Sequence, residues 1–164
     1  MDPANPFLLC YDASEDASHA IRRAGSVLGG GPAVVVHAWR PPSAFMIPGR
    51  VIEEPHPLAS AAAEFDASAA AEAERIASEG AELANACGFS ATHTTVKDTR
   101  GAWPGIVRLA DELDARAVVV GSHGRSSIRD TLLGTVSHGI LHHCRRPVLV
   151  IPMGNPTEDA ERSS

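Results

Sequence analysis

The sequence predicts an α/β protein in which a five-stranded parallel sheet is covered by helices on both faces, a doubly wound fold. Short apolar segments of strand length alternate about five times with segments whose apolar residues recur every three or four positions. The sequence has no Asn-Gly hairpin signal, so we expect each strand to reach the next through a helix. At 164 residues the chain is long enough for one domain with a sizeable core.

The first half of the chain is predicted to hold two strands and two helices. Residues 7–11 and 33–39 are continuous apolar runs, typical of strands buried on both faces. Residues 18–28 and 60–87 each carry an apolar helical stripe. The stripes consist of Ala20, Ile21, Ala24, Val27 and Leu28 in the first helix, and of Phe65, Ala69, Ala73, Ile76, Gly80, Leu83 and Cys87 in the second.

The segment 40–59 between the second strand and the second helix contains five prolines, which exclude a regular helix. A connection of this length inside a compact domain is often functional. Its apolar tip, Phe45 to Ile47, either packs back onto the fold or forms a flap over a ligand, and the sequence leaves both open.

The second half repeats the alternation. Residues 92–97 predict a polar edge strand, a helix begins near Pro104, and residues 117–120 predict another buried strand. A glycine-rich loop, a helix over 134–144 and a last strand over 147–152 follow. We therefore expect one domain over 1–153 and a polar tail over 154–164.

Composition excludes several function classes. A net charge of -6 without a basic cluster disfavours a nucleic-acid binder or a protein held on membranes by charge. We find no apolar run of the ~20 residues that span a bilayer and no secretory signal pattern, so we expect a cytoplasmic protein. Cys10, Cys87 and Cys144 are odd in number and widely spaced, which favours small buried side chains over disulfides or a zinc site.

Ligands of open parallel sheets bind beyond the carboxyl ends of the strands, which here points to Asp12, Ala38 and the loop from Gly121. Glycines in this loop allow the backbone to approach a ligand closely. Gly134-Thr135 is a predicted helix start, whose free N–H groups favour an anion such as phosphate. The loop is not a Walker A motif, and a glycine-rich loop that merely turns is the alternative.

The spacing Gly121-x2-Gly124-x9-Gly134-Thr135 resembles the nucleotide-binding motif of the universal stress protein family. The opening strand that ends in Tyr11-Asp12-Ala13-Ser14 and the closing strand are similar to that family as well. The resemblance implies the sheet order 3-2-1-4-5. It also implies that Asp12 lies near adenine or ribose and that the backbone near Ala38 meets the adenine edge. The residues implied to hold ribose and phosphates are Gly121, Gly124, Arg125, Gly134, Thr135, Val136 and Ser137.

One departure from the family pattern is Ala13, which stands where the family usually has glycine next to the first-strand aspartate. A small shift of the pocket would follow from this difference. His123 lies between the two loop glycines, where it either approaches a phosphate or is a solvent-exposed loop histidine. We expect no metal site formed by protein side chains at His138, His142 and His143, although their spacing is helical.

The implied function is that of an ATP-binding regulator or sensor in stress response, with Mg²⁺ or Mn²⁺ bound through the phosphates. The implied assembly is a homodimer, because Val148–Ile151 would be an apolar strand at the sheet edge. The alternatives are a nucleotide-free interaction module, a slow ATPase and a cyclic nucleotide binder. We assign no catalytic residue, because no general base with a water-positioning partner can be identified.

Overall fold

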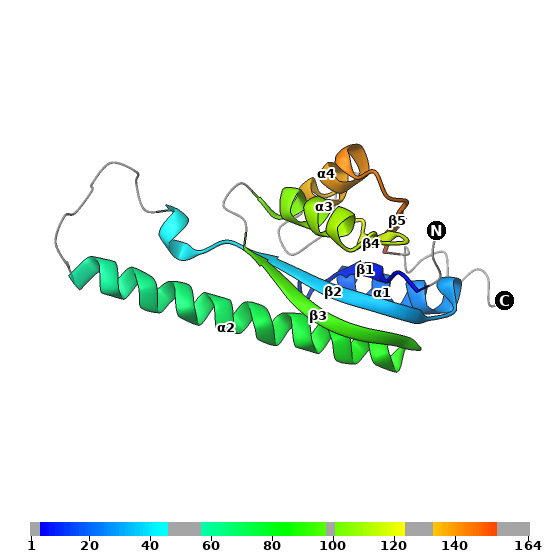
Figure 1. Cartoon of the computed structure of the whole chain (residues 1–164), viewed down its shortest axis with the longest axis horizontal. Helices are drawn as coiled ribbons and strands as arrows, with labels where there is room; N and C mark the ends of the chain where they lie inside the picture. Colours follow the sequence, from blue (N-terminus) through cyan, green and yellow to red (C-terminus); the bar gives the residue numbers. More distant parts are fainter. Residues whose placement is uncertain (1–3, 46–56, 98–100, 124–132, 154–164) are drawn as a thin grey trace.

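The computed structural model describes residues 4–45, 57–97, 101–123 and 133–153. They form one five-stranded sheet of order β3-β2-β1-β4-β5 in which every pair is parallel (Figure 1). This confirms the predicted fold class and strand order. The strands are β1 (Phe7–Cys10), β2 (Gly31–Trp39), β3 (Phe89–Lys97), β4 (Val118–Gly121) and β5 (Val148–Ile151).

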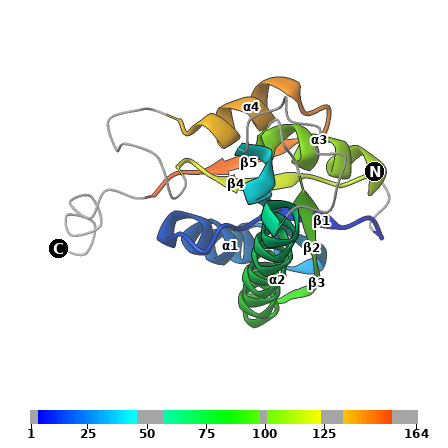
Figure 2. The same cartoon turned by 90° about the vertical axis from the view of Figure 1, so that its left-hand side faces the viewer.

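Two helices cover each face of the sheet, as Figure 2 shows. Helices α1 (Glu15–Leu28) and α2 (Pro57–Ala86) lie on one face, and α3 (Ala102–Glu112) and α4 (Thr135–His143) lie on the other. Successive residues of a strand point to opposite faces. The neighbours Leu8 and Leu9 on β1, both fully buried, therefore belong to two separate cores, Leu8 on the α3–α4 side and Leu9 on the α1–α2 side.

Helix α2 begins well beyond the sheet, next to the short 3₁₀ helix η1 (Pro42–Phe45), and packs on the sheet only further along (Figure 1). Phe65 lies in the protruding part and is 65% exposed, so its predicted burial is wrong. The buried residues of α2 lie further along, at Ala73, Ile76, Ala77, Gly80, Ala81 and Ala84. Val27 on α1 is also exposed, because it faces the outer edge of the sheet next to β5.

Both ends of the predicted 40–59 connection are helical. Helix α2 starts at Pro57, and η1 is fixed to it because the backbone N–H and hydroxyl of Ser43 donate to Asp66 at 3.0 and 2.6 Å. These hydrogen bonds hold the pKa of the Asp66 carboxyl below its ordinary value. Met46 and Ile47 lie outside the described residues, so the flap stays a prediction.

Other boundaries differ from the predicted ones by a few residues. Helix α1 begins three residues early because Ser14 caps it, and β3 begins at Phe89 because Phe89 and Ala91 pack into the core. Helix α3 begins at Ala102 rather than at Pro104. The predicted tail, 154–164, lies outside the described residues.

The three cysteines are free and pack against the two cores, with Cys10 buried and the others half-buried. Burial raises the pKa of the Cys10 thiol far above its ordinary value. Within the described part of the chain, none of the helices combines the length and apolarity that a membrane crossing requires.

Candidate functional site

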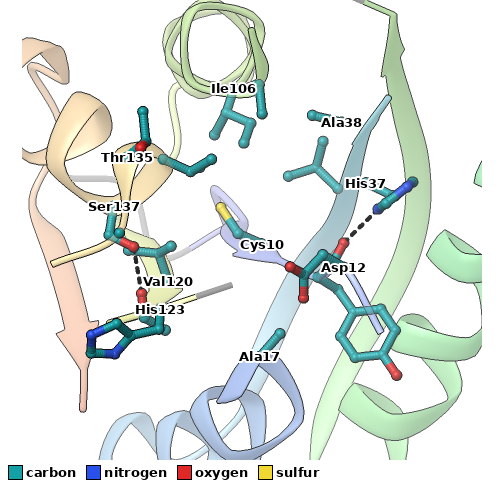
Figure 3. A pocket seen from close by; sticks show the side chains of 16 residues that line it. Cys10, Asp12, Ala17, His37, Ala38, Ile106, Val120, His123, Thr135 and Ser137 are labelled. Atoms are coloured by element: carbon teal, nitrogen blue, oxygen red, sulfur yellow. Dashed lines mark hydrogen bonds between the residues drawn. The ribbon is translucent and has the colours of Figure 1, made fainter. Parts of the chain in front are cut away.

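A pocket of about 390 Å³ opens at the carboxyl edge of the sheet, where the strand order reverses between β1 and β4 (Figure 3). Its volume lies within the range of small-molecule sites. The lining residues come from both sides of this edge. They are Cys10, Tyr11, Asp12, Ala17, Val36, His37, Ala38, Ala102, Ile106, Val120, Gly121, His123, Gly134, Thr135, Val136 and Ser137.

One wall of the pocket is the start of α4. Its N-cap is Gly134, in extended conformation, which has no side chain to accept a hydrogen bond from the first turn. The backbone N–H groups of Thr135, Val136 and Ser137 precede the first intrahelical hydrogen bond, which runs from the His138 N–H to the Gly134 carbonyl at 2.9 Å. An uncapped helix start with the positive end of its dipole on a pocket favours an anion.

Three hydrogen bonds fix this helix start to the end of the sheet. The Ser137 hydroxyl donates to the Gly121 carbonyl at 2.6 Å (Figure 3), and the Gly134 N–H donates to the Ser122 carbonyl at 2.7 Å. The Ser122 N–H in turn donates to the Ile151 carbonyl of β5 at 3.0 Å. The hydroxyl proton of Ser137 is thus already used within the protein, although its oxygen can still accept.

The part of the pocket across from the α4 start is apolar and is formed by residues of β2 and α3. Side chains of Val36, Ala38, Ala102 and Ile106 form this part, and in Figure 3 Ala38 and Ile106 lie across the pocket from Ser137. All four belong to the core beneath α3 and α4 or pack against it. Such a surface suits a flat, largely apolar group, whereas the α4 start suits a negative charge.

Asp12 also lines the pocket, from the turn between β1 and α1, and lies near His37 in Figure 3. One carboxylate oxygen accepts from the Ser14 N–H at 3.0 Å, which fixes the side chain in the turn. Ala13 between them has a φ of 62°, in the left-handed region that alanine adopts only with strain. This is the position where the resemblance predicts glycine, and the structure keeps the glycine-like backbone with alanine in place.

Two residues that the sequence analysis did not single out hold the end of β1. The Tyr11 carbonyl accepts from the His37 ring at 2.8 Å, so the proton is on Nδ1. The Tyr11 hydroxyl donates to Glu79 on α2 at 2.7 Å, and burial together with this bond raises the pKa of Tyr11. Tyr11 directly precedes Asp12 and His37 directly precedes Ala38, and this adjacency to predicted site residues could have pointed to both in the sequence.

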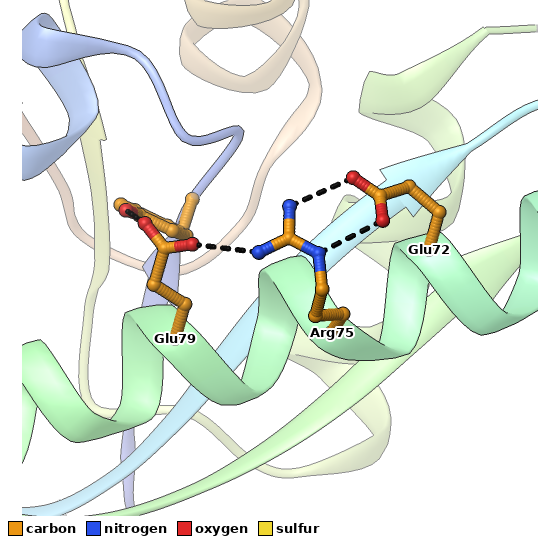
Figure 4. A network of polar contacts seen from close by, with 4 residues as sticks. Glu72, Arg75 and Glu79 are labelled. Atoms are coloured by element: carbon orange, nitrogen blue, oxygen red, sulfur yellow. Dashed lines mark hydrogen bonds and ion pairs between the residues drawn. The ribbon is translucent and has the colours of Figure 1, made fainter.

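Glu79 also belongs to a charged network on the outside of α2 (Figure 4). Arg75 donates two hydrogen bonds to Glu72, at 2.7 and 2.8 Å, and a third to Glu79 at 3.2 Å. Its bonds to Glu72 and Glu79 raise the pKa of Arg75. The network therefore holds the Glu79 carboxylate where the Tyr11 hydroxyl meets it.

All the predicted site residues that the structure describes line this one pocket: Asp12, Ala38, Gly121, Gly134, Thr135, Val136 and Ser137. Gly124 and Arg125 lie in 124–132, outside the described residues. His123 lies at the pocket too, but its ring points away from the centre in Figure 3, and its Nδ1 is 2.9 Å from the Ser122 hydroxyl. The His123 ring is half-buried, so it is neither directed at the centre of the pocket nor fully exposed to solvent.

The histidines of α4 do not line the pocket. His143 stacks on Trp103 with ring centroids 4.3 Å apart, and its Nδ1 lies 2.9 Å from the Gly139 carbonyl. Trp103 thereby joins α3 to α4. His138 and His142 form a separate ring pair, and no third potential metal ligand joins them among the residues that the structure describes.

Comparison with known proteins identifies a family whose model matches most of the chain and relatives whose sequences match short segments of it. Residues 4–152 match the model of the universal stress protein family. A stretch of 50 residues is 32% identical to universal stress protein MJ0577 of Methanocaldococcus jannaschii, and covers 30% of this chain and 31% of that protein. A stretch of 36 residues is 56% identical to universal stress protein Rv2005c of Mycobacterium tuberculosis, and covers 22% of this chain but only 12% of that protein. The matched segments thus span a third or less of these relatives.

Solved structures share the fold over nearly the whole chain. The structure of MJ0577 has a TM-score of 0.74 at 19% identity and covers 94% of this chain and 99% of its own. The universal stress protein from Archaeoglobus fulgidus in complex with dAMP has a TM-score of 0.59 at 24% identity, with 90% and 97% coverage. A universal stress protein in complex with cAMP has a TM-score of 0.58 at 23% identity, with 91% and 98% coverage. With a family match that extends over residues 4–152 and the same fold in these structures, the chain belongs to the universal stress protein family.

Proposed function

We propose that this protein binds ATP in the pocket at the carboxyl edge of its sheet and acts as a nucleotide-dependent regulator or sensor in stress response. The proposal rests on one observation: the uncapped start of α4 and a group of apolar side chains line the same pocket. A nucleotide has the matching two ends, a flat base and a phosphate chain. Family members of the same fold in complex with dAMP and cAMP support an adenine nucleotide as the ligand class.

In this arrangement the adenine contacts the apolar side chains near Ala38 and Ile106, and Asp12 accepts a hydrogen bond from the base or ribose. The phosphates lie against Gly121 and the first-turn N–H groups of α4. Gly124 and Arg125 complete the phosphate site in the proposal.

A divalent cation, Mg²⁺ or Mn²⁺, accompanies the phosphates in this proposal. Asp12 is the one carboxylate among the described residues that line the pocket. The other polar side chains there are hydroxyls, the Cys10 thiol and the rings of His37 and His123, and the Nδ1 atom of each ring already has a hydrogen-bond partner. A hard cation at such a site is better held through phosphate oxygens and water than in a protein cage. When bound, the cation would neutralise phosphate charge.

Calorimetry with ATP, ADP and adenosine, each with and without Mg²⁺, tests the proposal. We expect all three ligands to bind, and Asp12→Ala to weaken each by about tenfold, the loss expected for a hydrogen bond to a charged group. Asp12→Asn keeps an acceptor for the Ser14 N–H and serves as the matched control. Absence of heat and of a thermal shift at millimolar ATP would leave the nucleotide-free interaction module as the better function.

A nucleoside monophosphate or cyclic nucleotide is the second candidate ligand, because two structural neighbours were solved with dAMP and cAMP. Mass spectrometry of the nucleotide released from purified protein distinguishes it from ATP. We propose at most slow hydrolysis, since the His123 ring points away from the centre of the pocket (Figure 3).

We also propose a homodimer formed through β5, the apolar edge strand. The carbonyls of Pro147 and Ile151 accept from the N–H groups of Val118 in β4 and of Ser122 just after it, at 2.8 and 3.0 Å. Backbone groups of alternate residues point to opposite sides of a strand, so Val148 and Val150 present theirs to the open edge. Pairing with a second copy would satisfy them in a self-complementary interface.

Light scattering of Val150→Pro tests the dimer. Proline removes an N–H that points outward and leaves the hydrogen bonds to β4 in place, so the variant should be a folded monomer. Val150→Ala loses comparable side-chain packing but keeps the N–H, and it should remain a dimer. A monomeric unmodified protein at micromolar concentration would contradict the proposal.

A further inference from the structure

Asp16, in the first turn of α1, is a buried acid next to the pocket that the proposed nucleotide contacts do not use. It is 6% exposed. One carboxylate oxygen, Oδ2, accepts from the backbone N–H of His123 at 2.7 Å. The same oxygen lies so close to Gly121 that a β-carbon at that position would overlap with it. Asp16 therefore contacts the loop at Gly121 and His123 without lining the pocket itself, next to the proposed phosphate site.

The second oxygen of Asp16 is unusual. Oδ1 is buried and has no hydrogen-bond partner among the described residues. None of the ion pairs within this part of the chain includes Asp16. Buried polar atoms are nearly always paired, so an orphaned carboxylate oxygen calls for an explanation beyond loop anchoring.

The carboxyl group of Asp16 lies in a setting that is compatible with a negative charge. It accepts from a backbone N–H and lies in the first turn of a helix, where the dipole stabilises a carboxylate. Since water is excluded and no cation is paired with it among the described residues, its charge is weakly screened. A buried negative charge behind the phosphate end repels every negative charge that a ligand brings to the front of the loop.

We propose that Asp16 is a specificity-determining residue that selects nucleotides by the charge of their phosphate chain. The inference rests on the proposed nucleotide site and adds a selection rule to it. Asp16 lowers the affinity for each further phosphate charge and leaves the affinity for the uncharged nucleoside unchanged. A cation bound to the phosphates reduces this loss of affinity, because it lowers the net negative charge of the phosphate chain near Asp16.

Asp16→Asn separates this role from loop anchoring. Asparagine has nearly the same shape and keeps an oxygen for the His123 N–H, but removes the charge. Affinities for adenosine, AMP, ADP and ATP are measured in the absence of divalent cations. We expect adenosine to change less than about twofold, AMP to gain about threefold and ATP about tenfold or more, following the Coulomb energy of successive charges.

The matched control is Glu15→Gln, which removes an exposed charge from the same helical turn and should change none of the four affinities by more than about twofold. Repeating the titrations with Mg²⁺ should shrink the gain for ATP. Asp16→Ser removes the same charge with a smaller side chain, and replaces Asp16→Asn if circular dichroism shows that the asparagine variant does not fold.

Equal changes for all four ligands would overturn the inference, because Asp16 would then act through loop geometry alone. A loss of affinity that grows with ligand charge would overturn it as well, since the carboxylate would then favour the charged ligands instead of opposing them. Failure of the unmodified protein to bind any of the four would contradict the proposed function itself, and the inference with it.

Discussion

Helices α1 and α4 both begin beside the same pocket, but their first turns are built in opposite ways. At the start of α1, side chains of the helix itself and of its cap provide a hydrogen-bond acceptor and negative charge. The Ser14 hydroxyl accepts from the Ala17 N–H at 3.1 Å, and Glu15 and Asp16 add negative charge. The first turn of α4 contains no acid, and its cap is Gly134.

The difference shows why a helix start by itself does not define an anion site. In α1 the protein's own side chains already neutralise the positive end of the dipole, so a ligand anion would gain little there. In α4 the N–H groups and the dipole remain for a ligand. In the proposal the phosphate end is therefore assigned to α4 and Asp12 to the nucleoside end, while Asp16 contacts the loop at Gly121 and His123.

The largest expected effect comes from making the α4 start resemble that of α1. Gly134→Asp places a capping carboxylate on the first-turn N–H groups, and the extended backbone at this position accepts an aspartate. We expect ATP affinity to fall by about a hundredfold or more, and the helix start to gain ~1 kcal/mol from the new cap. Isothermal calorimetry and thermal unfolding measure both.

Gly134→Ser, which caps the helix without adding a charge, is the control, and it should lower the ATP affinity less than Gly134→Asp does. Adenosine should bind both variants about as well as the unmodified protein, because it has no phosphate. A folded Gly134→Asp variant that binds ATP normally would show that α4 does not hold the phosphates.

Removing the cap of α1 should instead affect stability. Ser14→Ala leaves the Ala17 N–H without its acceptor, and we expect a loss of ~1 kcal/mol in the free energy of unfolding. Denaturant unfolding measures this loss, with Ser26→Ala on the exposed side of the same helix as control. ATP affinity should change little, and a large loss of affinity in a folded Ser14→Ala variant would mean that α1 also contacts the ligand directly.

Ala13→Gly tests the strained turn that leads into α1. Glycine removes the cost of the left-handed conformation but makes the unfolded chain more flexible, so we expect a small net gain of up to ~1 kcal/mol in stability. The opposite sign is expected for Ala71→Gly, at an exposed position inside α2, where glycine costs ~1 kcal/mol. Equal destabilisation by both changes would contradict the strain at Ala13.

The smallest effect concerns Tyr11, just before the same turn. Burial and its hydrogen bond to Glu79 raise its pKa, so the unfolded chain loses the phenol proton first as the pH rises above 10.0, the ordinary value. Stability should therefore fall with rising pH above that point, and Tyr11→Phe should remove this part of the pH dependence.

The titration can be followed directly, because Tyr11 is the single tyrosine of the chain and its ionisation changes the near-ultraviolet absorbance. Glu79→Gln keeps an acceptor without the charge and should lower the pKa of Tyr11 toward the ordinary value. A tyrosine that titrates normally in the folded protein would contradict the Tyr11–Glu79 contact.

Local sequence patterns were sufficient for the order of elements and for the edge of the sheet at which the site lies, whereas the fuller set of site residues came from the resemblance to a family. Apolar runs such as residues 117–120 can become strands only when both faces are covered, and glycine before threonine is a recognisable helix start. Residues that follow successive parallel strands must meet at one edge, which is why Asp12, Ala38 and Gly121 could be grouped before their positions were known. The strand order itself came from the resemblance to a family.

The tertiary structure decided what periodicity cannot express, namely where each helix meets the sheet. Phe65 and Val27 follow an apolar stripe but are exposed, because the sheet does not extend beneath the first part of α2 and ends at β5 beside α1. In the sequence, Asp16 is an ordinary acid in the first turn of a helix. In the structure it is buried, because the end of β4 places Gly121 and His123, more than a hundred residues away in the chain, against it. Burial depends on such contacts between distant segments, and a pattern within one helix carries no information about them.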